Sequence, residues 1–406
     1  MSAKIPVSAI ICEFDPLHFG HKLVLDAARA AGGLVCCVMS GQFTQRAAPA
    51  MLDKWARARL ALENGADLVV ELPLSWACAG AERFAAGGVA LAAALGADTL
   101  WFGSECPDTA ALCRLADALL SPAFSQALAD QPQQGASFAG RRQQAVARLL
   151  GAGDAALLAL PNANLGVEYI KAIRRQNAPI RPSPILRQGA GHGRETPLGA
   201  APGGGKRPSP PILSAGQLRD ILRAGGTLDG LAPESTARAV ALARAQGRCP
   251  ASLERLERAV LCQLRALPPQ AFSALPDMSE GLDHRLYRAA RQAGSLEELY
   301  ALAKSRRYSH ARMRRLVLAA FLGLRAPLPP LPPYLRVLGM GPRGHKILGQ
   351  GPLGLPVVAR PKDLKKLPGE ALDTFQAEAR AGDLYGLACP VAQPAGEDFT
   401  RPVVRV

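Results

Sequence analysis

The sequence predicts an α/β protein with a doubly wound parallel sheet, followed by a mainly helical C-terminal region. Short apolar runs alternate with stretches of helical periodicity in the N-terminal part of the chain. Continuous apolar runs are typical of strands buried on both faces, as in a parallel sheet covered by helices. Few strand-like runs occur in the second half before residues 334–338 (YLRVL), which indicates mainly helical structure there.

The individual elements follow from local patterns. Buried strands are expected at residues 8–12, 34–39, 67–72 and 99–102. Helices are expected at residues 20–31, 54–64 and 81–95. Two segments rich in Gly or Pro interrupt these patterns. Residues 189–211 predict a flexible loop or lid, and residues 326–333 (APLPPLPP) predict a stiff polyproline linker.

Composition excludes several classes of protein. An apolar fraction of 49% with 20% charged residues is typical of a folded, water-soluble chain. No window approaches 18 uninterrupted apolar residues and no secretory signal is recognisable, so we expect a cytoplasmic protein without a membrane span. The nine cysteines form no CxxC pair and no histidine lies at zinc-ligand spacing from them, which predicts reduced thiols and no metal site.

A phosphate-binding pattern follows the first predicted strand. His18, Gly20 and His21 stand where a turn leads into a helix. Free N–H groups and the positive end of the dipole attract phosphate to a helix start. Gly20 lets the backbone approach a ligand, and histidines three residues apart share one face. Two unrelated core or surface histidines would give the same HxGH pattern. Its position after the first strand, at a predicted helix start, favours an α-phosphate site. Neither a P-loop motif nor GxGxxG occurs here.

The motif and seven further segments resemble a known family. The N-terminal pattern is similar to the HIGH-type nucleotidyltransferase superfamily. In chain order, the similar segments are residues 13–21 (EFDPLHFGH), 38–49 (VMSGQFTQRAAP), 54–57 (KWAR), 67–73 (DLVVELP), 102–105 (FGSE), 161–169 (PNANLGVEY), 304–316 (KSRRYSHARMRRL) and 334–338 (YLRVL). Together they resemble the bacterial tRNA(Met) cytidine acetate ligase family.

The resemblance implies a two-step activity. Acetate is activated with ATP to acetyl-adenylate, and the acetyl group passes to N4 of the wobble cytidine of elongator tRNA(Met). The implied cofactor is ATP with Mg²⁺, and the implied fold is Rossmann-like. The expected organisation is a nucleotidyltransferase-like ATP-binding domain (1–225), a helical RNA-binding region (226–326) and a small C-terminal α/β region (334–406).

Site residues follow from the same resemblance. His18 and His21 are the expected catalytic pair. The expected ATP-site residues are Ile11, Cys12, Glu13, Phe14, Asp15, Gly20, Val24, Gly103, Asn162, Arg187, Gln188, Ser214 and Arg219. Asn162 could hold adenine or ribose, although an Asn after a Pro also caps turns. Gly103 could admit the nucleotide or be an ordinary turn glycine.

The sequence departs from the family pattern at two places. Residues 190–194 (AGHGR) replace an AGYHD-like run. In the later phosphate-binding element, which resembles SxTxxR, Gly216 stands where a threonine is expected. Ser214, the helix start and Arg219 would then bind pyrophosphate without a threonine hydroxyl, which predicts altered handling of pyrophosphate.

A basic segment is the expected RNA surface. A formal net charge of +15 favours a polyanionic partner, although an Arg-rich composition also reflects a GC-rich genome. Arginine forks suit phosphates and a tyrosine can stack on a base. A solvated basic helix face is the alternative for residues 304–315, and structural ion pairs are the alternative for Arg46 and Lys54, which could also bind phosphate. The RNA-binding candidates are Arg46, Lys54, Lys304, Arg306, Arg307, Tyr308, Arg312, Arg314 and Arg315.

Two other functions stay open at this stage. A small-molecule adenylyltransferase of the same fold would share the histidine pair, but the helical half and the basic segment disfavour it. A non-catalytic RNA-binding relative would tolerate Gly216, but the intact His18 and His21 disfavour that function.

Overall fold

The computed structural model describes residues 4–131, 138–188, 212–279, 281–305 and 308–406. Its centre is one sheet with the strand order β5-β4-β1-β2-β3-β6-β7, and β8 pairs with β6. The strands are β1 (Val7–Cys12), β2 (Leu34–Ser40), β3 (Leu68–Leu72), β4 (Thr99–Ser104), β5 (Arg181–Leu186), β6 (Leu335–Met340), β7 (Val357–Val358) and β8 (Val404–Arg405). The first five strands are parallel, which confirms the predicted fold class.

Helices cover both faces of this sheet. Along β1, the side chains of Val7, Ala9 and Ile11 enter one apolar cluster, while Ile10 and Cys12 enter another. The first cluster includes residues of α4 (Ala81–Ala94), α5 (Thr109–Leu120) and α9 (Pro161–Arg175). The second includes residues of α1 (Phe19–Ala30), α2 (Lys54–Glu63), α10 (Ala215–Arg223) and α11 (Glu234–Ala245). Side-chain alternation along a buried strand therefore produces the double winding.

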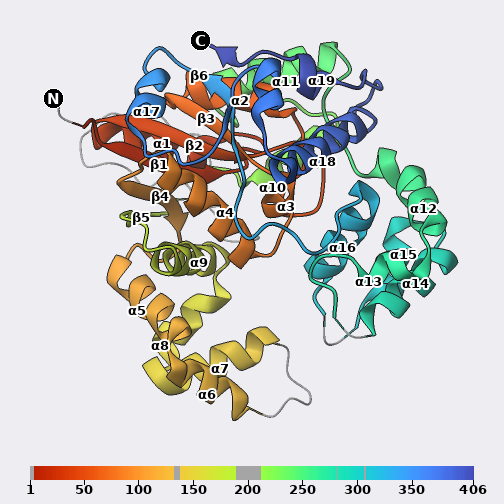
Figure 1. The fold of residues 1–406 in the computed structure, drawn as a ribbon, viewed down its shortest axis with the longest axis horizontal. Helices are drawn as coiled ribbons and strands as arrows, with labels where there is room; N and C mark the ends of the chain where they lie inside the picture. The colour runs from red at the N-terminus through yellow and green to blue at the C-terminus, as the bar shows by residue number, and fades with distance from the viewer. Residues whose placement is uncertain (1–3, 132–137, 189–211, 280, 306–307) are drawn as a thin grey trace.

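Two further groups of helices extend from the sheet, as Figure 1 shows. One comprises α6 (Pro122–Ala129), α7 (Phe138–Leu150) and α8 (Ala152–Ala156), which the sequence analysis did not anticipate. The other is the predicted helical region and comprises α12 (Glu257–Ala266), α13 (Pro269–Ser273), α14 (Leu282–Gln292), α15 (Leu296–Ala303) and α16 (His310–Leu322). This second group has its own apolar core, which α3 (Leu74–Ala77) and α18 (Gly369–Gly386) join.

The C-terminal residues complete the main sheet. β6 pairs antiparallel with β3, and α17 (Gly344–Gln350) and α19 (Glu397–Thr400) accompany this part of the chain. The first strand of the expected C-terminal region (334–406) is therefore hydrogen-bonded to a strand of the expected N-terminal domain (1–225), so the two regions share one sheet. Local patterns could not reveal this pairing, since its partners are far apart in sequence.

Two other expectations can be compared with the fold. Within the described residues, no helix is both long and apolar enough to cross a membrane. The nine cysteines carry free thiols, and six of them are buried. The predicted loop at 189–211 lies outside the described residues.

Candidate active site

The turn after β1 places two histidines at the start of α1. His18 is the N-cap residue, and its Nδ1 accepts a hydrogen bond from the backbone N–H of Gly20 at 3.0 Å. A neutral imidazole that accepts at Nδ1 carries its proton on Nε2. This second nitrogen is therefore the one that can donate to a phosphate oxygen.

The two imidazoles are close to each other and neutral. Their ring centroids lie 3.9 Å apart, and the Phe14 ring meets His21 edge-on at 5.2 Å. Burial, followed by the charges of Arg187 and Arg219, lowers the pKa of His18 to about 3. Burial and the same neighbours lower the pKa of His21 well below its ordinary value, although the Pro16 carbonyl opposes them. Both rings therefore carry no positive charge of their own at neutral pH.

Hydrogen bonds to the neighbouring loop hold the turn before His18. Glu13 Oε1 accepts from the Gln45 N–H, and Asp15 Oδ1 accepts from the Met51 N–H, both at 2.7 Å. Arg57 Nη1 donates to the Glu13 carbonyl, also at 2.7 Å. The predicted ATP-site residues Glu13 and Asp15 thus shape the loop that presents the histidines.

A second element, around α10, lies against the first. Arg219 is 8% exposed, and its Nη1 donates to the Asp15 carbonyl at 2.7 Å. A Cβ atom placed on Gly20 would lie 3.9 Å from Ile212, so the segment before α10 contacts the start of α1. Ser214 is the N-cap of α10 in a capping box with Gln217. The start of α10, with Ser214 and Arg219, therefore lies beside the turn that carries the histidines.

The edge strand β5 and its neighbour β4 lead into a connected group of side chains. Arg187 Nη1 donates to Asn162 Oδ1 at 2.8 Å, and Asn162 Nδ2 donates to Glu105 Oε1 at 2.6 Å. Glu105 Oε2 also accepts from the Ala163 N–H at 2.8 Å, at the start of α9. A Cβ on Gly103 would lie 3.3 Å from the Arg187 side chain, so a larger residue would displace it.

Glu105 is a site residue that the sequence analysis did not single out. It lies in the FGSE segment, directly after the strand that carries Gly103. Burial alone would raise the pKa of Glu105, but hydrogen bonds from Asn162 and from backbone N–H groups lower it below its ordinary value. The sequence feature that could have revealed Glu105 is its position as an acidic residue directly after a strand, at the carboxyl edge of the sheet where ligands bind.

The remaining predicted ATP-site residues divide into buried and exposed positions. Ile11, Cys12 and Val24 are buried in the apolar clusters, with 7%, 7% and 8% of their surface exposed. Their side chains stabilise the fold, so any nucleotide contact there would come from the backbone. Gln188 is exposed beside Arg187.

The basic candidates are spread over several environments. Lys304, Arg314 and Arg46 are exposed, whereas Arg306 and Arg307 lie outside the described residues. Tyr308 is half-buried: its hydroxyl is 2.9 Å from Ser279 Oγ, and its ring lies under the Arg312 guanidinium at 4.9 Å. One face of the predicted stacking residue therefore already has a cationic partner.

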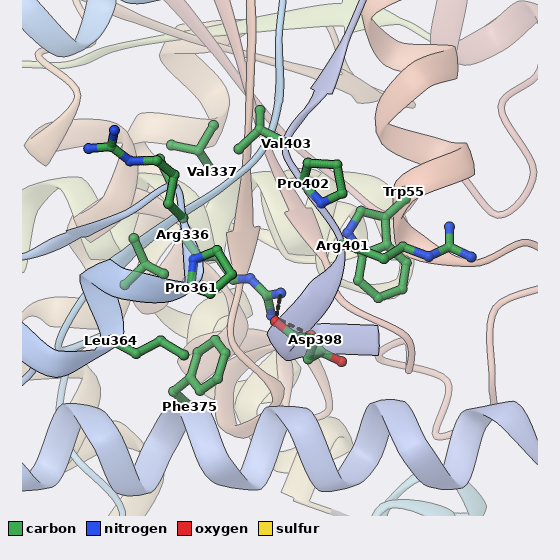
Figure 2. Close-up of a pocket in the computed structure, with 13 residues that line it drawn as sticks. Trp55, Arg336, Val337, Pro361, Leu364, Phe375, Asp398, Arg401, Pro402 and Val403 are labelled. Carbon is green, nitrogen blue, oxygen red and sulfur yellow. Dashed lines mark hydrogen bonds and ion pairs between the residues drawn. The ribbon is translucent and has the colours of Figure 1, made fainter. Parts of the chain in front are cut away.

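Lys54 does not belong to the RNA surface. Its side chain is fully buried, and its Nζ lies 2.6 Å from Glu71 and 2.5 Å from Asp398. Arg336 joins the same carboxylates, and Figure 2 shows its guanidinium directed at Asp398. The prediction was wrong because the KWAR segment does not reveal that carboxylates from β3 and α19 converge on this ammonium. Buried charges need such partners.

The fold and this site define a HIGH-type nucleotidyltransferase: a parallel sheet with paired, neutral histidines at the first helix start. The family model described as HIGH Nucleotidyl Transferase matches residues 5–398. A tRNA(Met) cytidine acetate ligase of Syntrophotalea carbinolica is 38% identical over 84% of this chain and 81% of its own. That of Caldanaerobacter subterraneus subsp. tengcongensis is 32% identical over 98% and 99%. The chain belongs to the tRNA(Met) cytidine acetate ligase family, as its motifs predicted.

Solved structures support the same assignment. The crystal structure of Thermotoga maritima TmcAL bound with alpha-thio ATP superposes with a TM-score of 0.88 at 28% identity, over 99% of this chain and all (100%) of that one. The apo form of the same protein gives a TM-score of 0.89 over the same shares. The family and the neighbour with its ATP analogue support ATP as the nucleotide.

Proposed function

We propose that this protein activates acetate with ATP and transfers the acetyl group to N4 of the wobble cytidine in elongator tRNA(Met). The observation that carries the proposal is the His18–His21 pair at the start of α1, with ring centroids 3.9 Å apart and within the electrostatic influence of Arg187 and Arg219. Relatives named for this reaction match most of the chain. Since ATP and tRNA meet in the cytoplasm, we place the protein there.

In the first step an acetate oxygen attacks the α-phosphorus of ATP. A new P–O bond forms, the bond to the β-phosphate breaks, and pyrophosphate leaves. His18 Nε2–H and the positive end of the α1 dipole would stabilise the oxygens that gain charge. Arg219 and Arg187 would hold the leaving pyrophosphate. The neutral imidazole of His18 fits its task at the α-phosphate, because it stabilises the transition state without trapping the anionic product.

In the second step the exocyclic N4 amine of cytidine attacks the acetyl carbonyl of the adenylate. The C–O bond to AMP breaks, AMP leaves, and the amine proton passes to solvent. An acyl-adenylate is an activated donor, so orientation of the amine supplies most of what the protein must contribute.

Mg²⁺ would enter with the nucleotide, where it neutralises phosphate charge. Within the described parts of the chain, no group of three or more His, Cys, Asp or Glu side chains could hold a metal ion. The ligands of Mg²⁺ would therefore be mainly phosphate oxygens and water, as is usual for this ion.

One experiment tests the proposal. The protein is incubated with ATP, Mg²⁺, radiolabelled acetate and unmodified tRNA(Met), and the digested tRNA is examined for labelled N4-acetylcytidine. Acetate-dependent exchange of pyrophosphate into ATP reports the first step alone. The absence of both signals would refute the proposal. Exchange without transfer would favour a small-molecule adenylyltransferase, and label from acetyl-CoA but not acetate would refute the adenylate chemistry.

A further inference from the structure

A cavity of about 190 Å³ lies between the ATP-binding part and the helical part of the chain. Its wall on one side comes from α3 and the start of α4, including Leu74 and Arg83. The opposite wall comes from α16, including Arg312, Arg315 and Ala319. Residues of α3 and α4 on one side and of α16 on the other thus surround one cavity that the adenylation chemistry does not use.

Three guanidinium groups line this cavity without a paired carboxylate. Among the described residues, no carboxylate lies within ion-pair distance of Arg83, Arg312 or Arg315. Arg83 Nε donates to the Ser75 carbonyl at 3.0 Å, and its guanidinium lies 4.8 Å from the centre of the Trp76 ring. The Nε atom of Arg315 is buried and has no hydrogen-bond partner within the described chain.

The balance of charge around the cavity is positive. Among the described residues that line it, Asp277 is the only carboxylate, and its electrostatic effect reaches both Arg83 and Arg315. Burial nevertheless lowers the pKa of both arginines below the ordinary value. Three positive groups against one negative group leave an excess of two charges. Arg83 and Arg312 donate to carbonyl and hydroxyl oxygens, which do not neutralise their charge. Partly desolvated charges without a paired carboxylate are unfavourable, so an anion would relieve this cavity.

The rest of the lining is apolar. Leu74, Leu316 and Leu328 contribute aliphatic surface, and Ala319 leaves space between them. A hydrated inorganic ion gains nothing from such a wall, whereas a ribose or base does. The combination of guanidinium groups and aliphatic surface matches one nucleotide of a single-stranded RNA segment.

We infer that this cavity takes one nucleotide of the RNA substrate, with its phosphate on Arg312 and Arg315 and its nucleoside against the aliphatic wall. The inference rests on the proposed function, since it assumes that the acceptor is a tRNA. It assigns a recognition role to Arg83, which comes from the ATP-binding part of the chain. It also gives a role to Arg312 and Arg315, which are half-buried on α16, whereas Arg314 is exposed.

The test measures the affinity of full-length protein for unmodified tRNA(Met) transcript over a range of salt concentrations. Arg315→Met keeps the aliphatic stem and removes the charge. We expect binding to weaken about tenfold, as for loss of a charged hydrogen bond. The slope of log K against log salt should fall by about 0.7, the value for one single-strand phosphate contact. The control is Arg288→Met, an exposed arginine on α14 that does not line the cavity.

A second variant separates the nucleoside from the phosphate. Ala319→Leu fills the cavity and keeps every charge, so affinity should fall with the salt slope unchanged. The inference is overturned if Arg315→Met weakens binding no more than Arg288→Met, or if Ala319→Leu binds tRNA as the wild type does. Failure of the proposed function would appear differently, as absence of acetate-dependent exchange and of acetylated nucleoside in the wild type.

Discussion

Nδ1 of His18 accepts from the backbone N–H of Gly20, so the residue proposed to donate to the nucleotide also caps helix α1. The cap satisfies an N–H group that would otherwise lack a partner, and it sets the tautomer that carries the proton on Nε2. Structure and chemistry at this position can therefore be separated by substitution.

His18→Asn should separate them. Asparagine is a good N-cap residue, so helix α1 should keep its start, but the outward donor is lost. We expect acetate-dependent pyrophosphate exchange to fall by about 10²–10³-fold, the usual cost of one such donor, with no loss of thermal stability. His18→Ala should lose the same activity and also about 1 kcal/mol of stability. Equal exchange in His18→Asn and the wild type would contradict the assigned role.

Gly20→Ala should disturb the same contact from the other side. An added Cβ would lie 2.8 Å from Cε1 of His18 and 3.0 Å from Nδ1, so the ring must move. Displacement of a reacting group by about 1 Å costs on the order of 10²-fold in rate. The control is Gly349→Ala in α17, where a Cβ meets nothing within 4 Å. Exchange should collapse only in Gly20→Ala, while both variants unfold at temperatures close to that of the wild type.

Glu105 is expected to act as a positioning residue. It fixes the Asn162 amide, which in turn holds Arg187. Glu105→Gln replaces one acceptor oxygen with an NH₂ group that faces N–H donors, so Asn162 loses its orientation. We expect KM for ATP to rise about tenfold, since a charge-assisted hydrogen bond is lost, with a smaller change in kcat.

The matched control for Glu105 is Asp108→Asn. Asp108 Oδ1 also accepts from backbone N–H groups at a helix start, at 2.9 Å from Ala110 N, but it caps α5 and has no part in the site. Its kinetic constants should stay at wild-type values. If both variants lower the melting temperature and raise KM alike, Glu105 only stabilises the start of helix α9 and does not position Arg187.

Much of this site could be predicted from sequence, because its signals are local. The turn residues, Gly20 and the histidine pair lie within one short segment, and each has a recognisable physical task. The strands β1 to β4 could be predicted for the same reason, since buried parallel strands are continuous apolar runs.

The features that could not be predicted depend on contacts between distant segments. The local sequence around Lys54 is typical of a surface lysine, but its partner Asp398 is 344 residues away in the chain. Glu71 inside the apolar run DLVVELP was the one available warning, because a carboxylate in a buried strand needs a buried partner. Likewise, nothing in the run at 334–338 indicates that β6 pairs with β3.

Gly216→Thr should restore the missing hydroxyl. A Cβ there would lie 3.6 Å from Ser214 Oγ and 3.9 Å from an Arg219 nitrogen, which are ordinary contacts. The added hydroxyl would face the region where Arg219 is expected to hold pyrophosphate, so we expect KM for ATP to fall a few-fold. Gly216→Ala controls for helix propensity, worth up to about 1 kcal/mol. The same KM in both variants would show that this position does not contact the nucleotide.

Glu378 should make the stability of the protein depend on pH. Burial, followed by the Glu71 carboxylate, raises the pKa of Glu378 to about 8 from an ordinary 4.5, although Lys54 opposes them. The folded chain therefore holds this proton more tightly than the unfolded chain does. Its contribution to stability is complete below about pH 4.5 and is lost as the pH rises through about 8.

Glu378→Gln mimics the protonated side chain and removes this dependence. Urea unfolding from pH 5 to pH 8 should give a wild-type free energy of unfolding that declines by up to about 1.4 kcal/mol per pH unit relative to the variant. Glu370→Gln, an exposed position on the same helix α18, should behave as the wild type. Parallel pH profiles for the wild type and Glu378→Gln would mean that Glu378 is ionised in the folded protein, with Lys54 as the dominant neighbour.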